Sequence, residues 1–259
     1  MSQQIKISKR DDLPQKKAIL IRTAAVLLSI VASGLVILAL GFNPIQVLSM
    51  IVTGALGTEL RIQQTVIKAI PLIITSMGII VAFKMKFWNI GAEGQIMMGA
   101  FGATAVALFF PANLPQPLML LCMALAAILC GGIWAFIPAF FKAKFNTNET
   151  IFTLMLNYIA IKWITYLQFG PWKDPESQGF PKVANFEPNE VLPSLFGVHI
   201  GWIFALILCG LVWVFINNTK RGFEITVVGE SLETARYAGM NIKAIIITAM
   251  LISGGLCGL

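Results

Sequence analysis

Charged side chains are scarce in this sequence. Of its 259 residues, 12% are Asp, Glu, Lys or Arg and 57% are hydrophobic, whereas a soluble domain has roughly 25% charged and about 45–50% apolar residues. A domain of this length has too little interior to hide so much apolar surface in one core. Lipid is the natural solvent for the excess, so the composition predicts a membrane protein.

The sequence also lacks the motifs of a self-contained enzyme. Its one histidine, His199, has no companions that would complete a Ser/His/Asp set, and no G-x-x-x-x-G-K-[ST] phosphate-binding loop is present. The cysteines form no CxxC pair and no Cys/His cluster with metal-ligand spacing; they are Cys122, Cys130, Cys209 and Cys257. We therefore expect no catalytic residue, no metal site and no cofactor bound by this chain.

Hydrophobic runs long enough to cross a bilayer recur along the chain. A membrane-spanning helix needs about 20 apolar residues to cross roughly 30 Å of hydrocarbon. The first run is longer than the apolar core of a secretory signal, about 7–15 residues, and no clear cleavage site follows, which favours a retained helix. We expect about seven spans, at about 18–40, 64–83, 90–110, 117–141, 151–169, 198–217 and 244 to the end. The predicted fold class is an all-α polytopic transmembrane helical bundle.

The last apolar run is short. Only about 16 residues follow Lys243, and the sequence stops at SGGLCGL without a polar tail, which is less than a full crossing. We therefore expect an incomplete transmembrane domain, truncated at its C-terminus.

Basic residues concentrate on one side of these spans. With a cytoplasmic N-terminus, the inner side receives Lys6, Lys9, Arg10, Lys16, Lys17, Arg22, Lys84, Lys86, Lys142, Lys144, Lys220, Arg221, Arg236 and Lys243. The outer side receives Arg61, Lys173 and Lys182, together with Glu59, Asp174, Glu176, Glu187 and Glu190. This is the positive-inside pattern. It assigns the net charge of +7 to membrane orientation rather than to nucleic-acid binding.

The topology divides the chain into a basic cytoplasmic tail, 1–17, and a transmembrane domain, 18–259. Within that domain we expect an external loop at about 170–197 and a cytoplasmic segment at about 219–243. Both segments have too few consecutive apolar residues to cross a membrane.

The stretch 87–100, FWNIGAEGQIMMGA, brings polar groups to the start of an apolar run. Trp88 is an amphipathic ring of the kind that favours a membrane interface. Gly91 and Gly94 allow a close backbone approach or a break in the helix. Glu93 has two interpretations: it pairs with a preceding lysine at the inner interface, or it faces a bundle interior or cavity, as ionisable groups within membranes usually do.

A second polar stretch, 146–163, reads NTNETIFTLMLNYIAIKW. One of its first three residues is expected to cap a helix, and Glu149 is favourable in the first turn. Thr153 and Asn157 are four residues apart and so share one helical face, and Lys162 adds a charge further along. This face serves either interhelical hydrogen bonding or a solute pathway.

A third stretch, 219–245, is too polar to insert into a membrane. Ser231, followed three residues later by Thr234, is typical of the start of a short helix, and Gly239 is suited to end it. A short helix between two spans on the cytoplasmic side is well placed for docking. An ordinary connecting loop is the alternative.

Together these stretches resemble the membrane-spanning permease subunits of ABC importers, in the group that serves nucleosides and simple sugars. The matching blocks are WNIGAEGQ (88–95), NETIFTLMLNYIA (148–160) and GESLETARYAGMNIKA (229–244), followed by SGGLCGL at the end. They occur in the family's order over most of the chain. The group is related to permeases for branched-chain amino acids, and its members continue into further spans that this chain lacks.

The resemblance implies a multi-pass protein of the bacterial inner membrane that pairs with a second permease subunit, identical or different. Two cytoplasmic ABC ATPases would hydrolyse the ATP, and an extracytoplasmic solute-binding protein would deliver a nucleoside or simple sugar. The expected partners are therefore these proteins and the lipid bilayer, with no nucleic acid.

The resemblance also implies that 230–239 supplies a helix that couples the permease to the ATPase. The residues expected to contribute to it are Gly229, Glu230, Ala235, Arg236, Ala238 and Gly239. A polar solute needs hydrogen-bonding groups in an otherwise apolar pathway. The pathway candidates are Trp88, Asn89, Glu93, Gln95, Asn157 and Tyr158.

Two other classes of function remain open on the sequence. In an ion-coupled carrier or channel, Glu93 would bind the proton or cation. A membrane scaffold would transport nothing.

Overall fold

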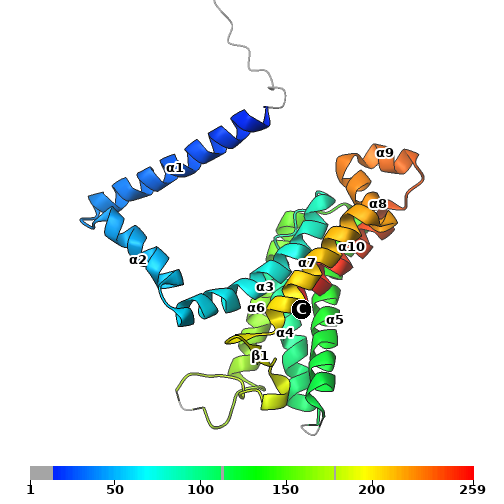
Figure 1. The fold of residues 1–259 in the computed structure, drawn as a ribbon. Coiled ribbons are helices and arrows are strands. Elements are labelled where there is room, and N and C mark those ends of the chain that lie inside the picture. The colour runs from blue at the N-terminus through cyan, green and yellow to red at the C-terminus, as the bar shows by residue number, and fades with distance from the viewer. Residues whose placement is uncertain (1–13, 112–113, 178) are drawn as a thin grey trace, which may run out of the picture. The chain divides into compact units, whose positions relative to one another are not determined.

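The structure is a computed structural model that describes residues 14–111, 114–177 and 179–259 (Figure 1). It consists of two compact units, 1–62 and 63–259. Most of the predicted basic tail, including Lys6, Lys9 and Arg10, lies outside the described residues.

The first unit holds two apolar helices, α1 (Gln15–Ala39) and α2 (Pro44–Leu56). The Asn43 side chain caps α2 by accepting a hydrogen bond from the Ile45 amide at 3.0 Å, and proline suits the first helical position. Helix α2 was not predicted, because its 13 residues are fewer than the roughly 20 apolar residues that a membrane-spanning helix needs. No residue of α1 or α2 is buried.

The second unit is a bundle of helices. Helix α3 (Glu59–Lys84) begins in the first unit, and most of its residues belong to the second. The helices that follow are α4 (Ala92–Phe109), α5 (Gln116–Phe145), α6 (Glu149–Phe169), α7 (Gly201–Asn218), α8 (Lys220–Glu230), α9 (Leu232–Tyr237) and α10 (Ile242–Gly258). Among the described residues, α1 and α3 to α7 are long and apolar enough to cross a membrane. They confirm six expected spans. The seventh, α10, is an apolar helix of 17 residues.

The span expected at about 198–217 is α7, which begins at Gly201. Before it, β1 (Ser194–Leu195) and β2 (Val198–His199) form an antiparallel hairpin. Its turn contains Phe196 and Gly197 at φ values of 57° and 76°, a left-handed conformation that glycine adopts readily.

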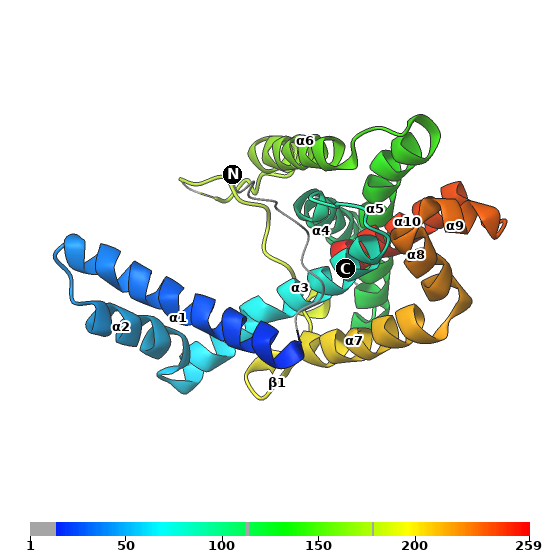
Figure 2. The same cartoon turned by 90° about the horizontal axis from the view of Figure 1, so that it is seen from above.

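The hairpin and the α8–α9 pair lie at opposite ends of the bundle (Figure 1). The segment between α6 and α7 also contains η1 (Pro188–Glu190), and Gln116 of α5 donates a hydrogen bond to the carbonyl of the residue after it, Val191. Viewed from above, α6 lies beside α4 on one side of the bundle, and α7 lies on the other (Figure 2).

Helix α10 packs in the centre, against α5 and α4. The contact uses small residues: a Cβ on Gly99 would collide with the backbone of Gly258, and one on Gly131 would come within 2.5 Å of the Gly254 carbonyl oxygen. Lipid tails are as apolar as leucine, so close packing of this kind drives helix association in membranes. The core therefore rests on backbone proximity more than on large side chains.

Candidate functional site

The turn between α3 and α4 begins with a left-handed residue. Lys86 has a φ of 57°, and the backbone doubles back so that the Phe87 amide donates to the Ala82 carbonyl at 3.1 Å. Phe87 is buried, whereas Trp88 is 60% exposed and contacts the Phe83 ring with centroids 5.5 Å apart. The turn thus buries Phe87 and leaves Trp88 exposed at the start of the WNIGAEGQ stretch.

Asn89, Gln95 and Ser253 form a buried polar cluster, which we call the amide clasp. Asn89 donates through Nδ2 to Gln95 Oε1 at 3.2 Å and to Ser253 Oγ at 3.4 Å, and its Oδ1 accepts from Gln95 Nε2 at 3.2 Å. All three side chains are at most 2% exposed. Because Ser253 belongs to α10, the clasp joins the start of α4 to the central helix.

Asn157 of α6 completes the start of α4. The first amides of a helix have no partner within it, and the residue before α4, Gly91, has no side chain to cap them. Asn157 supplies the cap from another helix: its Oδ1 accepts from the Gly94 amide at 2.8 Å, while its Nδ2 donates to the Ile90 carbonyl at 2.9 Å.

The two glycines of the stretch allow this approach. A Cβ on Gly91 would lie 2.9 Å from Thr153 Cβ, and one on Gly94 would lie 2.8 Å from Asn157 Oδ1. The expectation of close backbone approach is confirmed. Thr153 and Asn157 are both buried on the face of α6 toward α4, as their spacing predicted, and Asn157 makes the interhelical hydrogen bonds of the first interpretation.

Glu93 and Tyr158 are placed differently from the three amides. Both are exposed, and no ion pair joins Glu93 to either Lys84 or Lys86. The pairing interpretation of Glu93 is therefore not what the structure shows. Of the six pathway candidates, Asn89 and Gln95 bond each other, and Asn157 bonds the backbone at residues 90 and 94. The other three, Trp88, Glu93 and Tyr158, lie on exposed surface. A pathway role for each stays a prediction.

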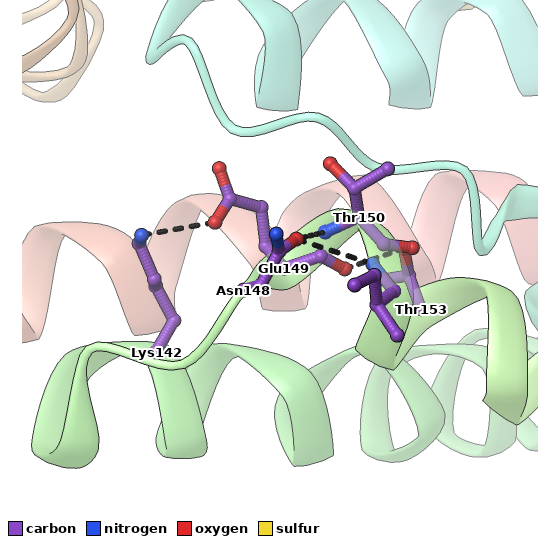
Figure 3. Close-up of polar contacts among 6 residues, drawn as sticks. Lys142, Asn148, Glu149, Thr150 and Thr153 are labelled. Atoms are coloured by element: carbon purple, nitrogen blue, oxygen red, sulfur yellow. Dashed lines mark hydrogen bonds and ion pairs between the residues drawn. The ribbon is translucent and has the colours of Figure 1, made fainter.

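The start of α6 is fixed by its own side chains (Figure 3). Of the three expected capping residues, Asn148 is the cap: its side chain accepts from the Thr150 amide at 3.0 Å. Glu149 pairs with Lys142 of α5 at 2.9 Å, and both side chains are partly buried. The pair holds the end of α5 against the start of α6.

The segment 219–243, which was expected to be cytoplasmic, folds as two short helices, where the sequence predicted one. Ser231 ends α8 and caps α9, accepting from the Thr234 amide at 3.2 Å, and Gly239 follows at a φ of 71°. The expected start and end of the short helix are confirmed. Within α9, Ala235 is fully buried against the core, whereas Tyr237 is 96% exposed.

Gly229 joins this segment to the α3–α4 turn. A Cβ at this position would collide with the carbonyl oxygen of Lys84 and would lie 3.1 Å from the Cα of Met85. The end of α8 therefore rests directly on the backbone that leads into the amide clasp.

A cleft of about 880 Å³ opens at the same end of the bundle. The α3–α4 turn, the end of α5, the start of α6 and the α8–α9 pair all contribute to its wall. Its charged lining residues are Lys86, Lys142, Glu149, Glu230, Glu233, Arg236 and Lys243. Because both signs of charge are present, the cleft is suited to contact the polar surface of another protein.

Two residues contribute to this site in ways that were not predicted from the sequence. Ser253 was seen only as part of an apolar run, although a hydroxyl there has to find a partner. Gly229 was expected to couple to the ATPase, but not to pack on the α3–α4 turn. Among the described residues, no group of three or more His, Cys, Asp and Glu could hold a metal ion.

Comparison with known proteins gives consistent matches. The family described as "Branched-chain amino acid transport system / permease component" matches residues 61–259. A glucose ABC transporter permease of Haloferax volcanii is 30% identical over all of this chain and 71% of its own length. A guanosine ABC transporter permease of Bacillus subtilis is 32% identical over 93% of this chain and 70% of its own. A nucleoside ABC transporter permease of Lactococcus lactis is 29% identical, over 94% and 69%. No solved structure matches.

Proposed function

We propose that this chain takes part in nucleoside uptake. The premise is that it belongs to the permease-component family of branched-chain amino acid transport systems and is a membrane-spanning permease subunit of an ABC importer. Its relatives include permeases named for guanosine and nucleosides and others named for glucose. The exposed aromatic side chains of α6 suit a planar base, which can stack on them through its whole ring face.

The observation that supports a mechanism is the contact between Gly229 and Lys84. We propose that the ATPase docks on the exposed side of α9 and on the charged cleft beside it. When the ATPases close, α8 and α9 move, and the contact passes that movement to the α3–α4 turn. From there the amide clasp and Asn157 connect the turn to α10, α4 and α6.

ATP can drive this change only if the ATPase binds the two permease conformations with different affinity. The cleft meets that need, because its walls belong to several elements. A shift of α9 relative to the α5–α6 junction changes the spacing of its charges, and so changes what the docked surface contacts. The movement of the ATPase can then reach the permease through packed helices, without a flexible linker between the two.

The remaining assignments follow from the family. We propose a second permease subunit, two cytoplasmic ATPases that bind and hydrolyse the ATP, and an extracytoplasmic solute-binding protein. We propose insertion in a bacterial inner membrane with a cytoplasmic N-terminus. The support is the positive-inside rule, applied to Lys84 and Lys86 at and just after the end of α3 and to Lys142 and Lys144 in the last turn of α5.

The test is uptake of labelled guanosine and glucose by proteoliposomes that contain the assembled transporter with its solute-binding protein. Guanosine should accumulate only with ATP, and unlabelled glucose should not compete. Accumulation driven by a proton or sodium gradient without ATP would favour the ion-coupled alternative instead. Uptake of glucose but not guanosine would overturn the nucleoside assignment and leave the importer intact.

A further inference from the structure

The outward face of α6 carries a lysine among aromatic rings. Tyr158, Lys162 and Tyr166 follow one another at intervals of four residues, so they share a face. Tyr158 and Tyr166 are 58% and 60% exposed, and Trp163 beside them is 43% exposed. Together with Ile159 they line a shallow, wide-open hollow of about 610 Å³ whose exposed lining is apolar, which we call the α6 recess.

Lys162 is poorly placed for a lipid-facing residue. It lies two turns, about 10 Å along the axis, before the outer end of α6 at Phe169. Helical side chains tilt toward the helix N-terminus, which is the inner end of α6, so Lys162 would have to reach against that tilt to meet the outer interface. Ionisable groups inside membranes usually face a bundle interior or a water-filled cavity.

The rings of the recess are partly held in position before any solute arrives. Trp163 makes an edge contact with Phe101 of α4, with ring centroids 6.2 Å apart, and lies 5.9 Å from the Tyr166 ring. Ordering these side chains in advance lowers the entropy that a bound solute must offset. Asn157, on the face of α6 toward α4, bonds the start of α4, so the recess is part of a helix that is tied to the α3–α4 turn.

From these features we infer that the α6 recess is a contact site for the transported solute, and that the solute is planar and heteroaromatic. Its ring stacks on Trp163 and the flanking tyrosines, while the Lys162 ammonium donates hydrogen bonds to ring carbonyl, ring nitrogen or hydroxyl acceptors. Lysine offers three donors and no acceptor, so it selects acceptor-rich solutes. The inference rests on the proposed function and adds the place and the chemistry of recognition.

Thiol labelling in the assembled transporter tests whether the recess contains water and solute. Tyr158→Cys should react with a charged, membrane-impermeant thiosulfonate faster than the parent chain with its four native cysteines, and guanosine should slow the reaction. Leu211→Cys is the matched control, because Leu211 lies at similar depth on an exposed apolar face of α7 and should stay unreactive. Glucose should give no protection.

Three labelling results would overturn the inference. The first is a Tyr158→Cys variant as unreactive as the parent, which would mean that lipid or protein covers the recess. The second is a reaction of Tyr158→Cys that guanosine does not slow, and the third is an equally fast reaction of Leu211→Cys. None of these depends on whether ATP drives guanosine uptake in the parent, so failure of the recess and failure of the proposed function give different results.

Uptake kinetics give the second test. Lys162→Met keeps the length of the side chain but removes its charge, and should raise the KM for guanosine about tenfold, because loss of one hydrogen bond to a charged donor changes affinity by about that factor. Lys162→Arg should retain most of the affinity. Equal KM values for the parent and Lys162→Met, at equal amounts of assembled protein, would contradict the assignment.

Discussion

Adjacent residues on α6 have opposite surroundings. Asn157 is 4% exposed and uses both ends of its amide to hold the start of α4, whereas Tyr158 is 58% exposed on the other face. Both are polar residues in an apolar helix, and both were expected to line the pathway. The difference teaches that one helix can carry a buried structural group and an exposed polar group at neighbouring positions, separated only by the rotation between adjacent residues.

The largest effect should come from removing the structural partner. Asn157→Leu leaves the Gly94 amide and the Ile90 carbonyl without their partner, so we expect a loss of stability on the order of 3 kcal/mol. Tyr158→Leu is the matched control, since it changes the next residue but no described hydrogen bond. The measurement is thermal unfolding of the purified transporter in detergent.

Equal melting temperatures for the two variants would break the comparison. So would a lower temperature for Tyr158→Leu alone, because the outward face would then be the one that supports the fold. If Asn157→Leu is destabilised as expected, guanosine affinity of the residual folded protein should change less than in Tyr158→Leu.

The sequence could not predict which of the two residues faces inward. In a soluble helix the polar side marks the solvent, but the inner and outer faces of a membrane helix are similarly apolar. The long spans were predictable from length and hydrophobicity, and the cap at Ser231 and the turn at Gly239 from local chemistry. The clasp was not, because Asn89 and Ser253 meet across 164 residues of sequence.

Helix α9 offers the same contrast between buried and exposed neighbours. Tyr237→Ser removes the most exposed aromatic side chain of the segment 219–243 without touching the core. If the ATPase docks on α9 as proposed, we expect at least about tenfold weaker binding of the ATPase and little change in melting temperature. Binding of purified ATPase to the permease in nanodiscs measures the first, and thermal unfolding the second.

Ala235→Leu is the counterpart of Tyr237→Ser on the buried side. Ala235 is fully buried, so a larger side chain should displace α9 and cost about 1–3 kcal/mol of stability by overpacking. Ala235→Leu would then lose coupling through misfolding rather than through docking. Normal ATPase binding by Tyr237→Ser would show that α9 is not the docking element.

A smaller effect is expected at the junction of α5 and α6. The Lys142–Glu149 pair is partly exposed, with side-chain exposures of 27% and 15%, so its coupling energy should be about 1 kcal/mol or less. A double-mutant cycle with Lys142→Met and Glu149→Gln measures that energy in thermal unfolding. A value well above 1 kcal/mol would mean that the cleft shields this pair from solvent more than its exposure indicates.

The smallest effect on stability belongs to Glu93. Its carboxylate is exposed and pairs with neither nearby lysine, so Glu93→Gln removes only a favourable interaction with the helix N-terminus, about 0.3–1 kcal/mol or less. Because Glu93 stays a predicted pathway residue, we expect a rise of about threefold in the KM for guanosine, which corresponds to one weak hydrogen bond. The same measurement separates two functions. An ATP-driven importer keeps its uptake when the proton gradient is collapsed, in parent and variant alike, whereas a carrier with Glu93 as its proton site loses uptake completely in Glu93→Gln. Complete loss of uptake would therefore favour the ion-coupled carrier, with Glu93 as its proton site.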